Sequence, residues 1–275
     1  MNNYKKIGLT ALAASLVSVS ANAGTLTASG SASMNMEGHS GTGLNAPTTF
    51  SMANSVTMSG SGEMDNGMTV TLSFEMDQGT ANNSSLGFDS HSVSVSSDTL
   101  GTLTLSGHGG NSATTAIDTT AAGDMWDNFD QLSNDLGITY ADGVTANGGG
   151  NNAIMYTSPD LMDGLNVTLS YNPQGSGAAS ESGYGFNYTG VEGLSLSYAN
   201  TDVETGTATT SGDNTVIKVS YAYGPVTVSY SEMENEVAAA ANAADKVSES
   251  YAVSYTVSDE LSVTYGSETH EQSNK

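Results

Sequence analysis

The feature that most constrains this chain is a two-residue alternation of apolar and small polar side chains, repeated along most of its length. In residues 247–257, valine and tyrosine occupy five of the six odd positions, and Ser, Ala or Thr fills every even position. Successive side chains of a β-strand point to opposite faces of a sheet. Each such segment therefore predicts a strand with one apolar face and one polar face.

Segments of this kind follow one another along the chain, and their connections are alternately short and long. Most short connections combine glycine with Asp, Asn or Glu, which suits tight hairpin turns. The predicted strands are residues 24–36, 48–64, 67–78, 89–97, 101–108, 152–158, 164–171, 181–189, 193–200, 213–222, 225–234, 246–257 and 260–268. The long connections follow every odd-numbered strand, at residues 37–47, 79–88, 109–151, 172–180, 201–212 and 235–245.

The alternation of short and long connections distinguishes between two all-β architectures. The Greek-key connections of a β-sandwich have no reason to place every long loop at one end. An up-and-down transmembrane barrel has short turns at one rim, long loops at the other, apolar side chains toward lipid and polar side chains toward the lumen. The sequence therefore predicts an all-β, up-and-down antiparallel transmembrane β-barrel.

The first residues differ from the rest of the chain. Lys5 and Lys6 precede an apolar run over residues 7–19, and Ala21-Asn22-Ala23 forms an A-x-A cleavage site. This order is that of a secretory signal peptide, and the run is too short for a helix that spans a bilayer. We therefore predict a signal peptide at residues 1–23, followed by the barrel at residues 24–275.

The composition restricts the partners of the exported chain. The formal net charge is −24, there is no arginine, and Lys218, Lys246 and Lys275 are the only bases after residue 23. Nucleic acid is excluded as a partner because phosphate binding needs clustered Lys and Arg. Cations are the natural counter-species of such an acidic surface, although solubility or adaptation to salt would produce the same charge. The chain has no cysteine, so it holds no disulfide scaffold.

Three stretches carry a resemblance to a known family. They are GSGEMDNGMTVTLSFEM at residues 60–76, LGTLTLSGHGG at residues 100–110 and NAIMYTSPDLMDGLNVTLSYNP at residues 152–173. In this order they resemble the second hairpin, the fifth strand and the Tyr-x-Ser-Pro hairpin of the general diffusion porins of the Gram-negative outer membrane. The resemblance implies a barrel of about 16 strands, usually a homotrimer, through which small hydrophilic solutes diffuse passively.

Two features depart from the family pattern. His108 stands where the family usually has an arginine on its fifth strand. The chain has no arginine that could form a basic side of the barrel wall. The chain ends with SETHEQSNK after about 13 strands, where family members end in a strand with a terminal aromatic residue. Because bacterial single-chain barrels have even strand numbers, we expect a chain truncated at its C-terminus, with a smaller complete barrel as the alternative.

The longest connection contains a different pattern. The resemblance implies that the loop between the fifth and sixth strands, here residues 109–151, folds into the lumen and narrows the pore. Within residues 121–137, Met125, Phe129, Leu132 and Leu136 recur with helical spacing and predict a short helix with one apolar face. The predicted pore constriction comprises Asp118, Asp124, Trp126, Asp127, Asp130 and Asp135. A solvent-exposed helix outside the barrel is the alternative.

Three further residues are predicted to line the lumen wall. Glu75 and Lys218 fall on the polar phase of their strands, and His108 takes the place of the family arginine. For Glu75 and Lys218, a solvated wall position and a role in selectivity are both open. Histidine is the side chain that ordinarily changes charge near neutral pH. For His108, a functional role and a bystander role are both open.

The sequence contains no set of residues that indicates catalysis. The four histidines lack the spacing of a metal site, no Gly-x-Ser-x-Gly elbow is present, and Gly148-Gly149-Gly150 lacks the lysine of a phosphate loop. We expect no enzymatic activity and no cofactor, although acidic loops suit loose binding of Ca²⁺.

We therefore predict an outer-membrane porin, a passive channel for small hydrophilic solutes and ions that prefers cations. Carboxylates in a narrow passage raise the local cation concentration and repel anions. Its expected partners are outer-membrane lipid, two further copies of the chain, small solutes and cations. Two alternatives stay open at this point: an exported β-rich surface or adhesin protein, and a barrel specific for sugars or peptides.

Overall fold

The computed structural model describes residues 25–38, 48–77, 88–117, 150–173, 180–205, 211–238, 244–258 and 261–274. These residues form one sheet of 13 strands, in which sequence neighbours are hydrogen-bonded neighbours, and every pairing is antiparallel. The strands are β1 (Thr25–Gly38), β2 (Thr48–Glu63), β3 (Thr69–Asp77), β4 (Ser90–Ser97), β5 (Gly101–His108), β6 (Ala153–Thr157), β7 (Leu165–Asn172), β8 (Ser180–Tyr188), β9 (Leu194–Glu204), β10 (Gly212–Tyr223), β11 (Val226–Val237), β12 (Ala244–Ser258) and β13 (Leu261–Asn274).

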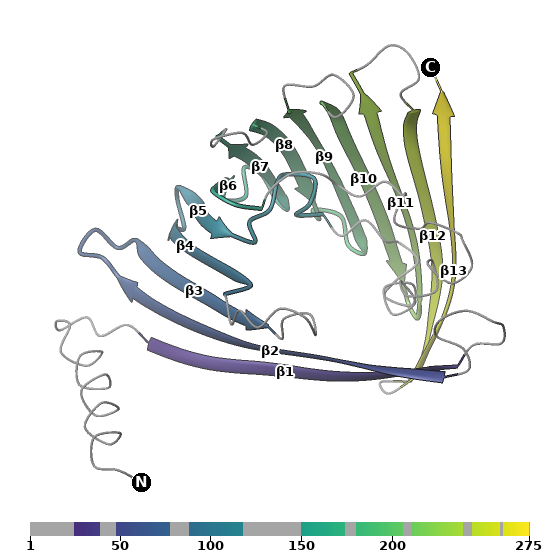
Figure 1. The fold of residues 1–275 in the computed structure, drawn as a ribbon, viewed down its shortest axis with the longest axis horizontal. Coiled ribbons are helices and arrows are strands. Elements are labelled where there is room, and N and C mark those ends of the chain that lie inside the picture. Colours follow the sequence, from purple (N-terminus) through teal and green to yellow (C-terminus); the bar gives the residue numbers. More distant parts are fainter. Residues whose placement is uncertain are drawn as a thin grey trace, which may run out of the picture.

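The structure confirms the predicted all-β, up-and-down antiparallel architecture and its thirteen strands. The sheet curves strongly, so that it has a concave and a convex face (Figure 1). β1 and β13 are its two edges, and no ladder joins them within the described residues. The helix predicted in residues 121–137 lies outside the described residues.

Several strands are longer than the alternation predicts. β13 reaches Asn274 rather than residue 268, β9 reaches Glu204 rather than residue 200, and β11 reaches Val237 rather than residue 234. The additional residues are mainly polar or acidic. A backbone ladder continues without apolar side chains, whereas our prediction of strand ends depended on them.

Glycine is required where two neighbouring hairpin turns touch. Gly193, between β8 and β9, has a φ of 78°, and its carbonyl accepts a 2.8 Å hydrogen bond from Ala222 N. A Cβ at this position would lie 2.2 Å from the carbonyl oxygen of Ala222. Any other residue would therefore be strained in its backbone and would push the turns apart.

The alternation separates the two faces of the sheet by polarity. On the convex face, which we call the outer face, large apolar side chains are exposed, as with Leu169 at 49% and Val228 at 49%. On the concave, inner face, polar side chains such as Thr201 and Ser231 are buried, at 0% and 1% exposed. In a water-soluble domain the distribution is the reverse, with apolar side chains buried and polar side chains exposed. A contiguous exposed apolar surface marks a contact with a partner or a membrane.

Candidate functional site

Small hydroxyl side chains line much of the inner face. Cross-strand register places on this face Ser92, Ser94 and Ser96 of β4, Thr102, Thr104 and Ser106 of β5, and Thr168 and Ser170 of β7. The aromatic side chains have the opposite orientation. Within the strands, the Phe and Tyr residues whose side chains the structure describes occupy outer-face positions: Phe74, Tyr156, Tyr171, Tyr184, Phe186, Tyr188, Tyr198, Tyr221, Tyr223, Tyr230, Tyr251, Tyr255 and Tyr265. The inner wall is therefore hydrophilic and largely free of rings.

Glu75 and Lys218 both occupy inner-face positions. Glu75 is half-buried near the long-loop end of β3, and its Oε2 accepts a 3.2 Å hydrogen bond from Ser90 Oγ. Lys218 is half-buried on β10, where its cross-strand partners are Ser197 and Ser231. The wall thus presents charges of both signs, and the selectivity role of either residue stays a prediction.

His108 is the last residue of β5 and lies beside an irregularity of the sheet. The register between β4 and β5 shifts there, so that His108 pairs with His91 while Ser106 pairs with Ser92. The side chain is exposed, and its Nδ1–H donates a hydrogen bond to the carbonyl oxygen of Asp89. The structure thus ties His108 to the start of β4, and its assignment to the lumen wall stays a prediction.

The connection after β5 begins with a narrow neck. Gly110 and Gly150 exchange two backbone hydrogen bonds, of 2.8 and 2.6 Å, which hold the first and last parts of the connection together. A Cβ at Gly110 would lie 2.6 Å from Ala153 Cβ and 2.7 Å from Ser106 Cβ. The close approach of the neck to β5 and β6 therefore depends on glycine.

A compact turn at residues 112–117 follows the neck, and we call it the capped turn. Ser112 Oγ accepts a 3.1 Å hydrogen bond from Thr115 N, and Ser112 N donates a 2.6 Å bond to Thr115 Oγ1. Ala116 N then donates to Ser112 O at 3.0 Å. This reciprocal pattern is that of a helical capping box, and it satisfies the backbone N–H groups of Ser112, Thr115 and Ala116 within the turn.

The capped turn lies inside the curve of the sheet, where the blue-green segment after β5 crosses toward β9 in Figure 1. Ala113 N donates a 2.9 Å hydrogen bond to Ser170 Oγ of β7. Thr114 Oγ1 and Thr201 Oγ1 of β9 form a 3.0 Å hydrogen bond. These bonds bridge 57 and 87 residues of sequence, and all four residues are buried. The first part of the connection therefore docks on the inner wall of strands that are distant in sequence.

An apolar cluster accompanies these polar contacts. It consists of Ala113, Ile117, Ala199, Val216 and Met233, all at most 9% exposed. Val216 and Met233 are direct cross-strand partners on β10 and β11. The capped turn is thus held by hydrogen bonds toward β7 and by both hydrogen bonds and apolar contact toward β9.

The six residues of the predicted constriction lie outside the described residues, which end at Ile117 and resume at Gly150. Asp118, Asp124, Trp126, Asp127, Asp130 and Asp135 therefore stay a prediction.

The outer face of β9–β12 changes from apolar to acidic along the strands. From the short-turn end, β11 presents Val226, Val228 and Tyr230, and then Glu232, Glu234 and Glu236. Carboxylates follow the apolar positions on the neighbouring strands as well. Together they form an acidic collar of Asp202, Glu204, Asp213, Glu232, Glu234, Glu236 and Glu249.

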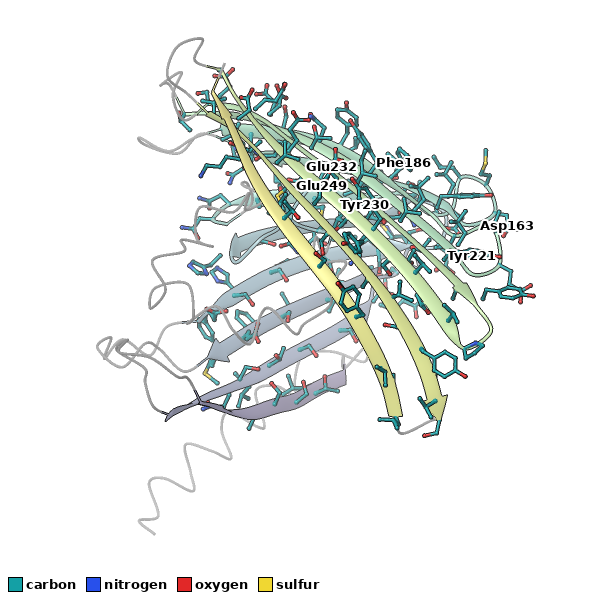
Figure 2. The ribbon with its side chains drawn as sticks, turned by 90° about the vertical axis from the view of Figure 1, so that its right-hand side faces the viewer. Asp163, Phe186, Tyr221, Tyr230, Glu232 and Glu249 are labelled. Carbon is teal, nitrogen blue, oxygen red and sulfur yellow. The ribbon has the colours of Figure 1, made fainter. Side chains whose placement is uncertain are left out.

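A tyrosine marks the boundary between the apolar surface and the collar. Tyr230 OH donates a 2.6 Å hydrogen bond to Glu232 Oε2. Glu232 and Glu249 are cross-strand partners, and Figure 2 shows Tyr230 between this pair and the end that carries Tyr221 and Asp163. Tyr198 and Tyr251 precede the collar on β9 and β12. An aromatic row with apolar residues on one side and charge on the other is typical of a membrane interface.

None of the described residues forms a group of three or more His, Asp or Glu side chains suited to hold a metal ion. Loose binding of Ca²⁺ at the acidic loops stays a prediction. No described helix is both long enough and apolar enough to cross a membrane.

The structure shows several contacts that the sequence analysis missed. Thr114 carried no signal of its own, and Ser170 and Thr201 appeared only as polar positions of alternating strands. The Ser-x-x-Thr spacing of the capping box was the one local signal available. Nothing in the sequence connected residue 114 with residue 201.

Comparison with known proteins agrees with this geometry. The family model of Gram-negative porins matches residues 8–275. A double mutant of Rhodopseudomonas blastica porin superposes with a TM-score of 0.50 at 15% identity, over 89% of this chain and 94% of the porin chain. A triple mutant of the same porin gives a TM-score of 0.51 at the same identity and coverage. At this identity the likeness concerns the fold. Among curated protein sequences, none matches the chain significantly.

Proposed function

The chain belongs to the Gram-negative porin family, and we propose that it is a passive diffusion channel for small hydrophilic solutes and ions that prefers cations. The observation that carries the proposal is the separation of the two faces, with apolar side chains exposed on the outer face and polar side chains on the inner face. A barrel wall of this kind faces lipid on one side and a polar lumen on the other.

The outer face supports a transmembrane position. Val228 and Val253, which are cross-strand partners, are 49% and 44% exposed in the middle of the apolar surface. Carboxylates such as Glu232 and Glu249 are costly in hydrocarbon, so the membrane boundary on β11 and β12 lies at the level of the cross-strand pair Tyr230 and Tyr251. The acidic collar then projects beyond the hydrocarbon on the side of the long loops, which in such barrels is the cell exterior.

The inner face supports diffusion of hydrophilic solutes without a specific binding site. Hydroxyl groups along β4, β5 and β7 can hydrogen-bond to water and to polar solutes in transit. A barrel specific for sugars would present aromatic rings along the passage, and the described strands place their rings on the outer face. The wall therefore favours a general channel over a substrate-specific one.

The proposed cation preference depends on the charges near the passage. The inner wall carries charges of both signs, among them Glu75 and Lys218. The balance is set by the acidic connection, whose aspartates outnumber the bases of the whole exported chain. Carboxylates in a narrow passage attract cations and repel anions.

Export by the signal peptide of residues 1–23 and assembly as a homotrimer are part of the proposal. An exported adhesin is the second candidate, because it would share the composition and the strands. It is disfavoured by the exposed apolar outer face, which needs a lipid or protein cover.

The test is to reconstitute the full-length protein in planar lipid bilayers under a KCl gradient. We expect stepwise increases in current that are linear in voltage, and a reversal potential of the sign expected for cation preference. The absence of discrete steps would contradict the channel. A reversal potential of the opposite sign would contradict the cation preference and leave the channel standing.

A further inference from the structure

Four polar side chains form one row across neighbouring strands of the inner wall, and we call it the amide row. Register pairs Asn166 of β7 with Asn187 of β8, and Asn187 with Ser197 of β9. Ser197 in turn pairs with Lys218 of β10. The four strands lie side by side in Figure 1. Because neighbouring strands are about 4.8 Å apart, the row extends over about 14 Å.

Two hydrogen bonds set which polar atoms the amide row offers. Ser197 Oγ donates to Asn187 Oδ1 at 2.6 Å, and Asn187 Nδ2 donates to Asn166 Oδ1 at 3.3 Å. Both carboxamide oxygens therefore accept a bond within the row. A carboxamide NH₂ has two hydrogens, and the row uses one hydrogen of Asn187 and neither of Asn166. The amide row thus offers mainly N–H donors to a solute.

Lys218 gives the amide row a positive end. An ammonium group has three donors, so it can contact a solute while it keeps a partner in the wall. The positions two residues before and after each member of the row hold Gly, Thr, Ser, Ala or Val, and none of these is acidic. In a chain with a formal net charge of −24, an anion at the row therefore meets no adjacent carboxylate on its own strands.

The amide row lies on the side of the short turns, away from the capped turn. Ser170 and Thr201, which contact the capped turn, are four residues further along β7 and β9 than Asn166 and Ser197. Four residues of a strand correspond to about 13 Å. A solute at the row would therefore lie between the level of the capped turn and the short-turn rim.

We propose that the amide row is a weak subsite for small solutes that combine a carboxylate with neutral oxygen acceptors. Lys218 binds the carboxylate, and the amide groups of Asn187 and Asn166 donate to the neutral oxygens. A charge-assisted hydrogen bond is stronger than a neutral one, so the carboxylate contributes most. The passage must also release its solute, so the binding is transient and the channel stays general. Its role in transport rests on the proposed channel, whereas binding itself does not.

Saturation-transfer NMR of the full-length protein in detergent micelles tests binding independently of conduction. The probe is gluconate, which has a carboxylate followed by a chain of hydroxyl groups. Sorbitol lacks the carboxylate, and acetate lacks the hydroxyl groups. We expect gluconate to bind more tightly than either control. Equal binding of sorbitol would overturn the role of Lys218, and equal binding of acetate would overturn the role of the amides.

Substitutions locate the bound gluconate. Lys218→Met is expected to raise its apparent dissociation constant about tenfold, and Asn187→Leu about fivefold. Lys218→Gln removes the charge with less change in polarity and serves if Lys218→Met does not fold. The matched controls are Lys246→Met and Asn235→Leu, which change another lysine and another hydrogen-bonded amide on inner positions of β12 and β11. An equal loss of binding in these controls would overturn the amide row as the site.

Single-channel recording then connects binding with transport. Gluconate added on the short-turn side is expected to reduce the open-channel current, and Lys218→Met should remove most of this reduction. A current reduction that is unchanged in folded Lys218→Met protein would overturn the transport role of the row. A wild-type protein that forms no channel would contradict the proposed function, and the NMR titration would still decide the binding.

Discussion

Replacing Val228 with arginine is expected to destabilise the membrane-inserted protein by about 2–4 kcal/mol, or to prevent insertion altogether. Val228 lies on the outer face of β11, midway between Val226 and Tyr230, where the apolar surface is continuous with Val253 of β12. A guanidinium at this depth must leave water for hydrocarbon, with no acidic neighbour at its own level. The acidic collar begins beyond Tyr230.

Ser229→Arg is the matched control, because the next residue of the same strand points to the inner face. There the guanidinium stays in contact with lumen water, and we expect a change of less than about 1 kcal/mol. The measurement is the urea dependence of the folded fraction in lipid vesicles. Equal destabilisation by the two substitutions would contradict the assignment of the faces.

Neutralising the acidic connection is expected to produce the largest change in selectivity. The change is Asp124, Asp127, Asp130 and Asp135 to asparagine, all in the part of the chain outside the described residues. At about 8 Å across water, one carboxylate changes the energy of a monovalent ion by about 0.5 kcal/mol before screening. Salt screens over about 8–10 Å, so the four together amount to roughly 1 kcal/mol, favourable for a cation and unfavourable for an anion. The difference of roughly 2 kcal/mol predicts about a thirtyfold fall in the cation-to-anion permeability ratio.

A control with the same change in net charge is available on the outer wall. Glu232, Glu234, Glu236 and Glu249 belong to the acidic collar, and their replacement by glutamine removes four charges from the opposite face of the sheet. The wall and intervening water separate them from the passage, so the reversal potential in a KCl gradient should stay close to that of the wild type. If the asparagine variant keeps its reversal potential, the segment of residues 121–137 is not at the constriction.

The strands could be predicted from the sequence because each membrane-facing segment must alternate between lipid and lumen. Val253 and Tyr255 are apolar for the lipid, while Ala252 and Ser254 are small for the inner face, and this pattern is local. The same reason explains the errors at strand ends. Around Glu236 and in the last residues of β13, the strands extend beyond the apolar surface. The backbone hydrogen bonds continue there, but the apolar alternation that predicts a strand does not.

The contacts inside the curve could not be predicted in the same way. The bond between Thr114 and Thr201 depends on how far the sheet curves, and a hydroxyl pair leaves no pattern in sequence. Gly183 was readable only as a glycine in a strand, although a Cβ there would lie 2.6 Å from Ser170 Oγ and 2.7 Å from Thr201 Oγ1. Likewise, the register shift beside His108 could not be predicted, because its place on the lumen wall was inferred from the position of the family arginine and a local irregularity of the ladder leaves no pattern in sequence.

The most direct test of the account is the accessibility of single cysteines along β11, in a chain that has no others. Thr227→Cys and Ser229→Cys should react with a membrane-impermeant thiol reagent through the lumen. A fluorophore attached at Val226→Cys, Val228→Cys or Tyr230→Cys should be quenched by a lipid-dissolved quencher, and Glu232→Cys should again react from water. Such a period of two, ending at Glu232, is the predicted result. Equal aqueous reactivity at odd and even positions would contradict a wall with lipid on one side and a lumen on the other.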